Sequence, residues 1–247
     1  MSRKKVSGNE KKRKKEDFFQ HFKENSFQNL IFFEILNFLL KHAGFGDILP
    51  LLLLWSFFMT DSFEIIRHFY PEDTPLRQLL LKHSQQVRDK VRFLAETYCP
   101  VSIDLTLAEN GALLHDIGIG RCHAPDILCC GTEHYLCHGV IGATMLRELD
   151  PALEPYARIC ERHTGSGLTA EDIRKQGLPL PVQDFLPETP EEKLICLADK
   201  FFSKSGNLQE KTFARVRASQ AKFGADALRR FDELCRFAGL DEKYEQI

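Results

Sequence analysis

The stretch LLHDIG at residues 113–118 places a histidine and an aspartate side by side at the end of an apolar segment. Residues 104–117 carry an apolar helical face that continues into His115 and Asp116, and glycines follow the pair. We therefore expect the pair at a buried helix C-terminus. Imidazole nitrogen and carboxylate oxygen together suit iron, manganese or zinc. The dipeptide alone is weak evidence, because a buried histidine often only hydrogen-bonds a carbonyl group.

Four further residues that can bind metal lie in segments with helical periodicity. They are His83 upstream, and His138, His163 and Asp199 downstream. His83 occupies the apolar stripe of segment 79–98, so its ring is expected to point inward. For His138 and His163 taken singly, a core or capping histidine is the alternative interpretation. The order His, His-Asp, His, His, Asp along a helical chain favours metal ligands.

Asp199 is predicted to lie on the apolar side of a helix, together with Ile195 and Phe202. Residues 189–192 read Thr-Pro-Glu-Glu, a capping box with proline at the first helical position, so a helix is expected from there to about residue 204. An ionised carboxylate on an apolar side costs on the order of several kcal/mol unless it is paired or binds metal. A salt bridge to a buried arginine or lysine is the alternative to a metal ion.

The periodicity predicts an all-α chain. Helices are expected near residues 64–69, 76–98, 104–117, 138–149, 153–163, 169–176, 190–204, 208–223 and 225–239. Loops are expected at 118–137 and 177–188, and neither shows strand alternation. The first of these loops follows the His-Asp pair, so we expect it to contact substrate.

The six candidate ligands together resemble the ligand set of the HD-domain superfamily, in the variant whose central motif reads His-Asp-Ile-Gly. The resemblance covers about residues 64–204 and implies an HD-domain helical bundle. The four-ligand core set that it implies consists of His83, His115, Asp116 and Asp199. His138 and His163 match the two extra histidines of members that hold two metals, in which Asp116 would bridge the ions.

The flanking sequence resembles a poorly characterised subgroup of phosphohydrolases, around residues 137–142, 162–165 and 191–195. The chain has no Gly-Tyr-Pro element of the kind that marks the cyclic-dinucleotide phosphodiesterase branch, so that substrate is not expected. The resemblance implies one or two divalent ions as cofactors, with manganese, iron, cobalt, magnesium and zinc as candidates.

The ligand chemistry predicts phosphoryl transfer to water. Two divalent ions can hold a hydroxide at neutral pH and neutralise a phosphoryl oxygen, so no protein nucleophile is needed. Phosphate also needs cationic partners, for which Arg121, Arg162 and Lys200 are the candidates near the ligands. Asp116, Arg121 and Lys200 form the predicted catalytic set. Each of the three basic residues has an ordinary surface position as its alternative.

We therefore predict a metal-dependent phosphohydrolase that acts on a small phosphomonoester or nucleotide-like substrate. A di-iron oxygenase of the HD type is one alternative, because the same six ligands can hold two irons. A sensor or binding module that has lost turnover is the other. The sequence does not predict the oligomeric state.

Composition agrees with an ordinary enzyme domain. A net charge of -2 over 247 residues argues against nucleic acid as the principal partner. The eight cysteines include no Cys-x-x-Cys pair, so we interpret them as reduced, mostly buried thiols of a cytoplasmic protein rather than as a zinc site.

Residues 1–62 form a predicted extension that is first basic and then apolar, and residues 63–247 form the predicted catalytic domain. Residues 1–25 hold nine lysines and arginines and are expected to be solvated or disordered. The apolar runs 30–40 and 48–59 are each shorter than the ~20 residues that span a bilayer. Membrane association through this extension is the less favoured alternative. One interpretation is that the natural polypeptide starts at Met59. Because the candidate ligands all lie between His83 and Asp199, residues 1–58 are predicted to be dispensable for catalysis.

Overall fold

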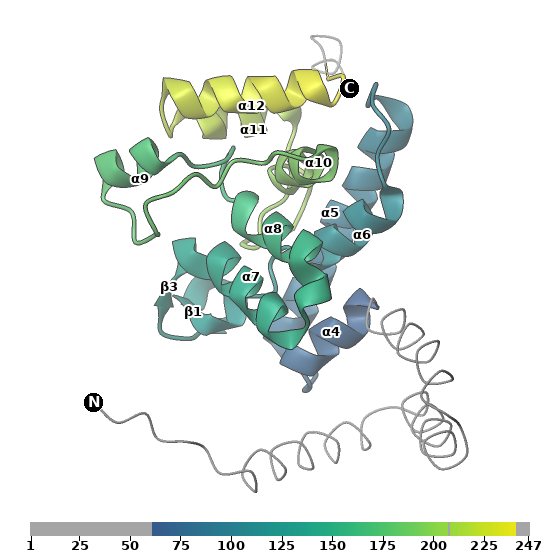
Figure 1. Cartoon of the computed structure of the whole chain (residues 1–247), viewed down its shortest axis with the longest axis vertical. Helices are drawn as coiled ribbons and strands as arrows, with labels where there is room; N and C mark the ends of the chain where they lie inside the picture. The colour runs from purple at the N-terminus through teal and green to yellow at the C-terminus, as the bar shows by residue number, and fades with distance from the viewer. Residues whose placement is uncertain (1–60, 207, 241–247) are drawn as a thin grey trace, which may run out of the picture. The chain divides into compact units, whose positions relative to one another are not determined.

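The structure, a computed structural model, describes residues 61–206 and 208–240 (Figure 1). These residues belong to one compact unit, Met59–Ile247. The predicted basic and apolar extension lies almost wholly outside the described residues, so its separation from the catalytic domain stays a prediction.

The described chain is mostly helical, which confirms the predicted all-α class. The helices are α4 (Ser62–Phe69), α5 (Pro75–Thr97), α6 (Leu105–Leu114), α7 (His138–Leu149), α8 (Glu154–Arg162), α9 (Ala170–Gln176), α10 (Pro190–Asp199), α11 (Phe213–Ala221) and α12 (Ala225–Phe237). Short 3₁₀ turns are η1 (Ile119–Arg121), η2 (Pro125–Ile127), η3 (Tyr135–Cys137) and η4 (Pro151–Leu153). Within the described ranges, no helix is both long enough and apolar enough to cross a bilayer.

Helix α10 lies at the centre of the helical packing. It contacts α5, α6, α8 and α12, and Figure 1 shows it between the α11–α12 pair and the remaining helices. Its predicted capping box is present, since the Thr189 side chain accepts from the Glu192 amide and the Glu192 carboxylate accepts from the Thr189 amide. Leu194, Ile195 and Leu197 are fully buried. The apolar sides of this helix therefore fix α5, α6 and α8 relative to one another.

Helix α10 ends at Asp199, so the predicted extension of this helix to residue 204 is wrong. The chain instead turns sharply, and the Lys211 ammonium donates to the carbonyl groups of Lys200 and Phe202. A side chain thus satisfies carbonyl groups that a further helical turn would have used. Helix α11 correspondingly begins at Phe213 rather than at residue 208.

The predicted loop 118–137 contains a small sheet, which corrects the expectation of a loop without strands. Strand β1 (Cys122–Ala124) pairs antiparallel with β2 (Cys129–Cys130) and parallel with β3 (Glu133–His134). Ala124 lies opposite Cys129, and His123 opposite His134. Alternation needs about four residues to be visible in a sequence, and these strands are shorter.

Candidate metal centre

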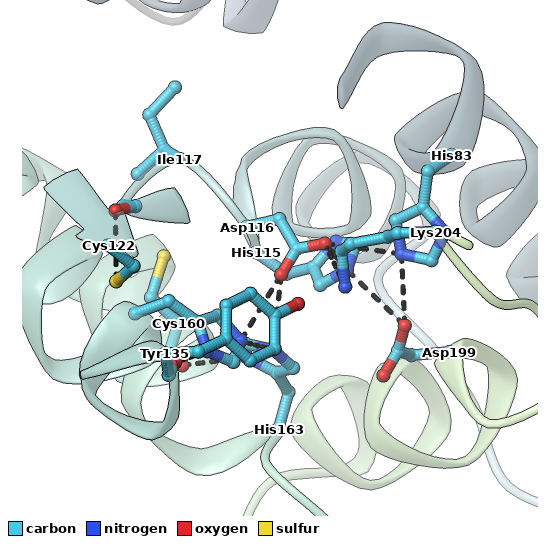
Figure 2. A network of polar contacts seen from close by, with 12 residues as sticks. His83, His115, Asp116, Ile117, Cys122, Tyr135, Cys160, His163, Asp199 and Lys204 are labelled. Carbon is cyan, nitrogen blue, oxygen red and sulfur yellow. Dashed lines mark hydrogen bonds and ion pairs between the residues drawn. The ribbon is translucent and has the colours of Figure 1, made fainter. Parts of the chain in front are cut away.

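The six predicted ligands come from five separate parts of the fold and meet in one place. His83 lies in α5, His115 and Asp116 in the turn just after α6, and His138 opens α7. His163 follows α8, and Asp199 is the last residue of α10. All six side chains belong to buried residues, and His115 and Asp116 have no exposed area. Figure 2 shows Asp116 between His163 on one side and His83 and Asp199 on the other.

The two oxygens of Asp116 face different ligands. Oδ2 lies 3.2 Å from His83 Nε2 and 3.1 Å from His115 Nε2. Oδ1 lies 3.3 Å from His138 Nε2 and 3.5 Å from His163 Nε2. Asp199 Oδ1 completes the first set, at 3.0 Å from His83 Nε2. One carboxylate therefore connects two groups of metal-binding atoms.

The hydrogen bonds of three histidines fix which ring nitrogen is free. The Nδ1 atoms of His115, His138 and His163 lie 2.6, 2.7 and 2.7 Å from backbone carbonyl oxygens three residues earlier in the chain. A carbonyl oxygen can only accept, so each Nδ1 carries the proton and each Nε2 presents a lone pair. The local turn that holds each histidine thus also sets its tautomer.

These Nε2 lone pairs face other hydrogen-bond acceptors. Neutral imidazoles that keep their Nδ1 hydrogen bonds have no proton at Nε2 to donate to those acceptors. His138 Nε2 and His163 Nε2 are 2.9 Å apart. His115 Nε2 and Asp116 Oδ1 are buried atoms without a hydrogen-bond partner, although each lies near the other side chains of the cluster. Lysine ammonium groups reach Asp116 Oδ2 and Asp199 Oδ2, but the imidazole Nε2 atoms and Asp116 Oδ1 still face one another, and such buried acceptors are costly unless a cation lies among them. The donor set of imidazole nitrogens and carboxylates fits divalent iron, manganese, cobalt or zinc.

The electrostatics of the cluster also call for positive charge. Burial would lower the pKa of His115, but the carboxylates of Asp116 and Asp199 outweigh it and raise that pKa to about 9. Burial likewise opposes ionisation of Asp116, yet His115 and Lys204 hold its pKa well below the usual value. Burial dominates at His163 and lowers its pKa to about 3. The carboxylates are thus charged, and His163 stays neutral, as a metal ligand must. His115 takes up a proton at Nε2 beside these carboxylates, and a metal ion bound there would take the place of that proton.

Lys200, one of the three predicted cationic partners, lies at the cluster. Its ammonium donates to Asp199 Oδ2 over 2.7 Å and to the backbone carbonyl of His163 over 3.0 Å. It therefore orients one ligand carboxylate and holds the turn after another ligand.

Arg121 and Arg162 are not brought to the ligands in the same way. Arg121 is exposed in η1. The Arg162 guanidinium donates to the Leu186 carbonyl over 2.7 Å and pairs with Glu188 over 2.9 Å, so it fixes the segment before α10. In the described part of the chain, the ammonium groups on the ligand carboxylates belong to Lys200 and Lys204, not to these arginines.

Lys204 is a residue of the cluster that sequence reasoning missed. Its ammonium lies 2.6 Å from Asp116 Oδ2, and its side chain is only 11% exposed. In a helix that continued to residue 204, Lys204 would lie about 140° around the axis from Asp199 and point away from the ligands. Because α10 ends at Asp199, the chain after it turns and brings Lys204 back to the ligands. The capping box could fix where the helix begins, but the sequence held no signal for its end.

The cysteines play no part in the ligand groups. All eight are free, and five of them are buried, as predicted for reduced thiols. The groups of side chains that could hold a metal in the described ranges contain only histidine and aspartate.

Tyr70, after α4, holds the turn that carries the His-Asp pair. Its hydroxyl donates to the Ile117 carbonyl over 2.6 Å and accepts from the Gly120 amide over 3.0 Å. We expect Tyr70→Phe to lower Mn²⁺ affinity by about tenfold, the lower end of the range for residues that orient ligands indirectly. A Mn²⁺ titration followed by calorimetry measures this. Tyr156→Phe, whose hydroxyl bonds Asn110, serves as the control and should bind Mn²⁺ like the wild type. Equal affinities for both variants would refute this role of Tyr70.

The fold and the cluster agree with comparisons to known proteins. The family model of the HD domain matches residues 80–203, which is half of the chain, so the chain belongs to the HD domain family. HD domain proteins bind divalent metals, and the matched range contains all six candidate ligands. Membership indicates metal-dependent, hydrolase-like chemistry.

Named relatives match over part of their length. An uncharacterized protein of Methanocaldococcus jannaschii is 45% identical over 97 residues, which is 39% of this chain and 49% of that protein. A tRNA (cytidine(56)-2'-O)-methyltransferase of Picrophilus torridus is 35% identical over 51% of this chain and 32% of its own length. That of Thermoplasma volcanium is 30% identical over 53% and 33%. The alignments thus span about a third to a half of these relatives. No solved structure matches the chain significantly.

Proposed function

We propose that the chain is a metal-dependent phosphohydrolase that releases phosphate from a small, nucleotide-like phosphomonoester. The observation that carries this proposal is the Asp116 carboxylate, whose two oxygens face separate groups of imidazole nitrogens. That arrangement suits two neighbouring divalent ions. The two named methyltransferases act on tRNA, and a segment like this chain makes up 32% and 33% of their lengths. A substrate with a nucleotide part fits that association.

The chain's own residues would bind the ions, orient the ligand carboxylates and exclude bulk water from the site. Divalent ions, when bound, acidify water and neutralise phosphoryl oxygens. Asp116 and Asp199 fix the positions of these charges, and Lys200 in turn fixes Asp199. In the reaction the water oxygen forms a bond to phosphorus and the ester P–O bond breaks. The leaving oxygen keeps the electron pair and takes up a proton. Burial of all six ligands strengthens each electrostatic contact in the site.

The same ligand set keeps a second candidate open, a di-iron oxygenase. Four imidazoles and two carboxylates suit iron as well as they suit manganese. The two candidates differ in what they consume and release, so a single set of assays separates them.

The purified protein, stripped of metal and reloaded with Mn²⁺, Fe²⁺, Co²⁺ or Mg²⁺, should release phosphate from some nucleotides or sugar phosphates. The expected result is release that depends on the metal and disappears with a chelator. Iron-dependent oxygen consumption without phosphate release would favour the oxygenase. Metal binding without either reaction would contradict both enzymatic proposals and favour a binding module.

A further inference from the structure

Lys200 and Lys204 hold their ammonium groups in different ways. The partners of Lys200 are Asp199 Oδ2 and the backbone carbonyl of His163, neither of which faces His83 and His115. The partner of Lys204 is Asp116 Oδ2, the oxygen that faces both of those histidines. Lys200 therefore keeps its partners when a metal ion binds between the histidines and the carboxylates. Lys204 does not.

An ion held by His83, His115 and Asp116 competes directly with Lys204 for one oxygen. Like charges repel strongly where water is scarce, and Asp116 has no exposed area. The Lys204 stem carries four methylene groups, so its ammonium can move while the backbone stays in place. Its side chain retains 11% exposure, so it is not completely enclosed.

Tyr135 marks where a displaced ammonium finds its next partner. The Tyr135 ring stacks on the His138 ring, with centroids 4.7 Å apart and an interplanar angle of 19°. Its hydroxyl accepts a hydrogen bond from Lys204, and Figure 2 shows this hydroxyl on the side of Asp116 and Lys204. Stacking on a ligand holds the ring in position. A cation and a hydroxyl thus lie together beside both ligand groups.

We infer that Lys204, released from Asp116 when metal binds, contacts a non-bridging phosphoryl oxygen of the substrate, with Tyr135 as its hydroxyl partner. This inference rests on the proposed phosphohydrolase function. It makes Lys204 a catalytic residue, because it touches the reacting group, and Tyr135 a positioning residue.

Charge balance gives the substrate class. The carboxylates of Asp116 and Asp199 are matched by the ammonium groups of Lys200 and Lys204, so each divalent ion adds uncompensated positive charge. A phosphomonoester carries close to two negative charges above its second pKa of about 6, whereas a diester carries one. The site should therefore prefer a terminal phosphate to an internal diester.

The test uses inorganic phosphate as the probe and the full chain loaded with Mn²⁺. Lys204→Met should weaken phosphate binding by about 10- to 100-fold, the range for a hydrogen bond to a charged group. Its Mn²⁺ affinity should be equal or higher, because a competing cation is gone. Tyr135→Phe, which keeps the stacked ring, should weaken phosphate binding by about threefold or more at unchanged Mn²⁺ affinity. Lys175→Met on the exposed face of α9 is the matched control and should change neither affinity.

Calorimetry reads both affinities without any turnover, so the result does not depend on finding the substrate. Phosphate affinity of Lys204→Met within about twofold of wild type would overturn the inference. Parallel loss of Mn²⁺ binding would overturn it too, since Lys204 would then only hold Asp116 in place. If Lys204→Met loses the helical circular dichroism signal and is therefore unfolded, the phosphate and Mn²⁺ affinities of Tyr135→Phe test the inference instead.

Methyl phosphate and dimethyl phosphate test the substrate class. The wild type should bind methyl phosphate more tightly than dimethyl phosphate. In Lys204→Met the ratio of these two affinities should be smaller. Equal binding of both esters by the wild type would overturn the preference. If instead the phosphohydrolase proposal failed, the protein would bind phosphate normally but release none from the tested substrates.

Discussion

Asp116→Ala is expected to lower kcat/KM by at least about 1000-fold, or ~4 kcal/mol of transition-state stabilisation. The residue connects both groups of ligand atoms, so its removal weakens one group and leaves only His138 and His163 in the other. Metal bound per chain should fall accordingly. Helix content should stay nearly unchanged, because Asp116 lies in the turn after α6 and not within a helix.

Asp116→Asn separates charge from volume. It keeps the shape of the side chain and removes the charge, so it should lose nearly as much activity as Asp116→Ala. Asp226→Ala, which removes an exposed carboxylate from the first turn of α12, is the control and should leave both metal content and kcat/KM intact. If Asp116→Ala kept more than about a tenth of the wild-type kcat/KM, a loss of only ~1.4 kcal/mol, the bridging role would be untenable.

Gly118→Ala is expected to destabilise the protein by about 3 kcal/mol and to disturb the second group of ligands. A Cβ atom at this position would lie 2.2 Å from the His138 carbonyl oxygen and 2.5 Å from the Gly142 amide nitrogen. Both are backbone atoms of α7 and cannot rotate away. The turn that carries Asp116 would have to separate from the start of α7, which bears His138.

Thermal unfolding measures the loss, which for a domain of this size corresponds to a fall in Tm of about 6–12 °C. Gly111→Ala in α6 is the matched control. There the Cβ would approach Ile159 Cδ1 and Ile195 Cδ1, the ends of side chains that can rotate, and alanine favours the helix. We expect this control within about 1 kcal/mol of wild type. Equal Tm values for the two variants would show that the contact between the turn and α7 is not tight.

The helix-borne candidate ligands could be predicted because each sits on, or directly beside, a helix with a readable apolar face. His83 shares the stripe of Leu80 and Val87, which are fully buried. Asp199 lies where the capping box at Thr189 sets the helix phase. Helical periodicity converts such positions into inward directions, so the sequence alone could indicate which side chains converge. Their convergence in space required the packing around α10.

What the sequence could not predict lies where periodicity stops. The strands around Cys122 and Cys129 are too short to show alternation. Lys204 reaches the cluster only because α10 ends at Asp199. Arg121 is predicted as a phosphate partner because it follows the motif, and in the structure it is exposed in η1 without a contact to a ligand carboxylate among the described residues. Each case depends on a turn whose geometry is set by distant contacts.

The position of α10 in the chain gives the metal centre an order of assembly during synthesis. The helix that packs against α5, α6 and α8 is also the one that brings Asp199, the last ligand to leave the ribosome. Chains emerge from the N-terminus at about 5–20 residues per second, so the earlier histidines wait several seconds with an incomplete core. Until α10 docks, the helices that carry the histidines contact one another but lack Asp199 and the apolar side of α10. Docking of α10 against the core and completion of the ligand group that contains Asp199 are therefore one event, whereas Asp116, His138 and His163 can meet earlier, because α6, α7 and α8 also pack through contacts that do not involve α10.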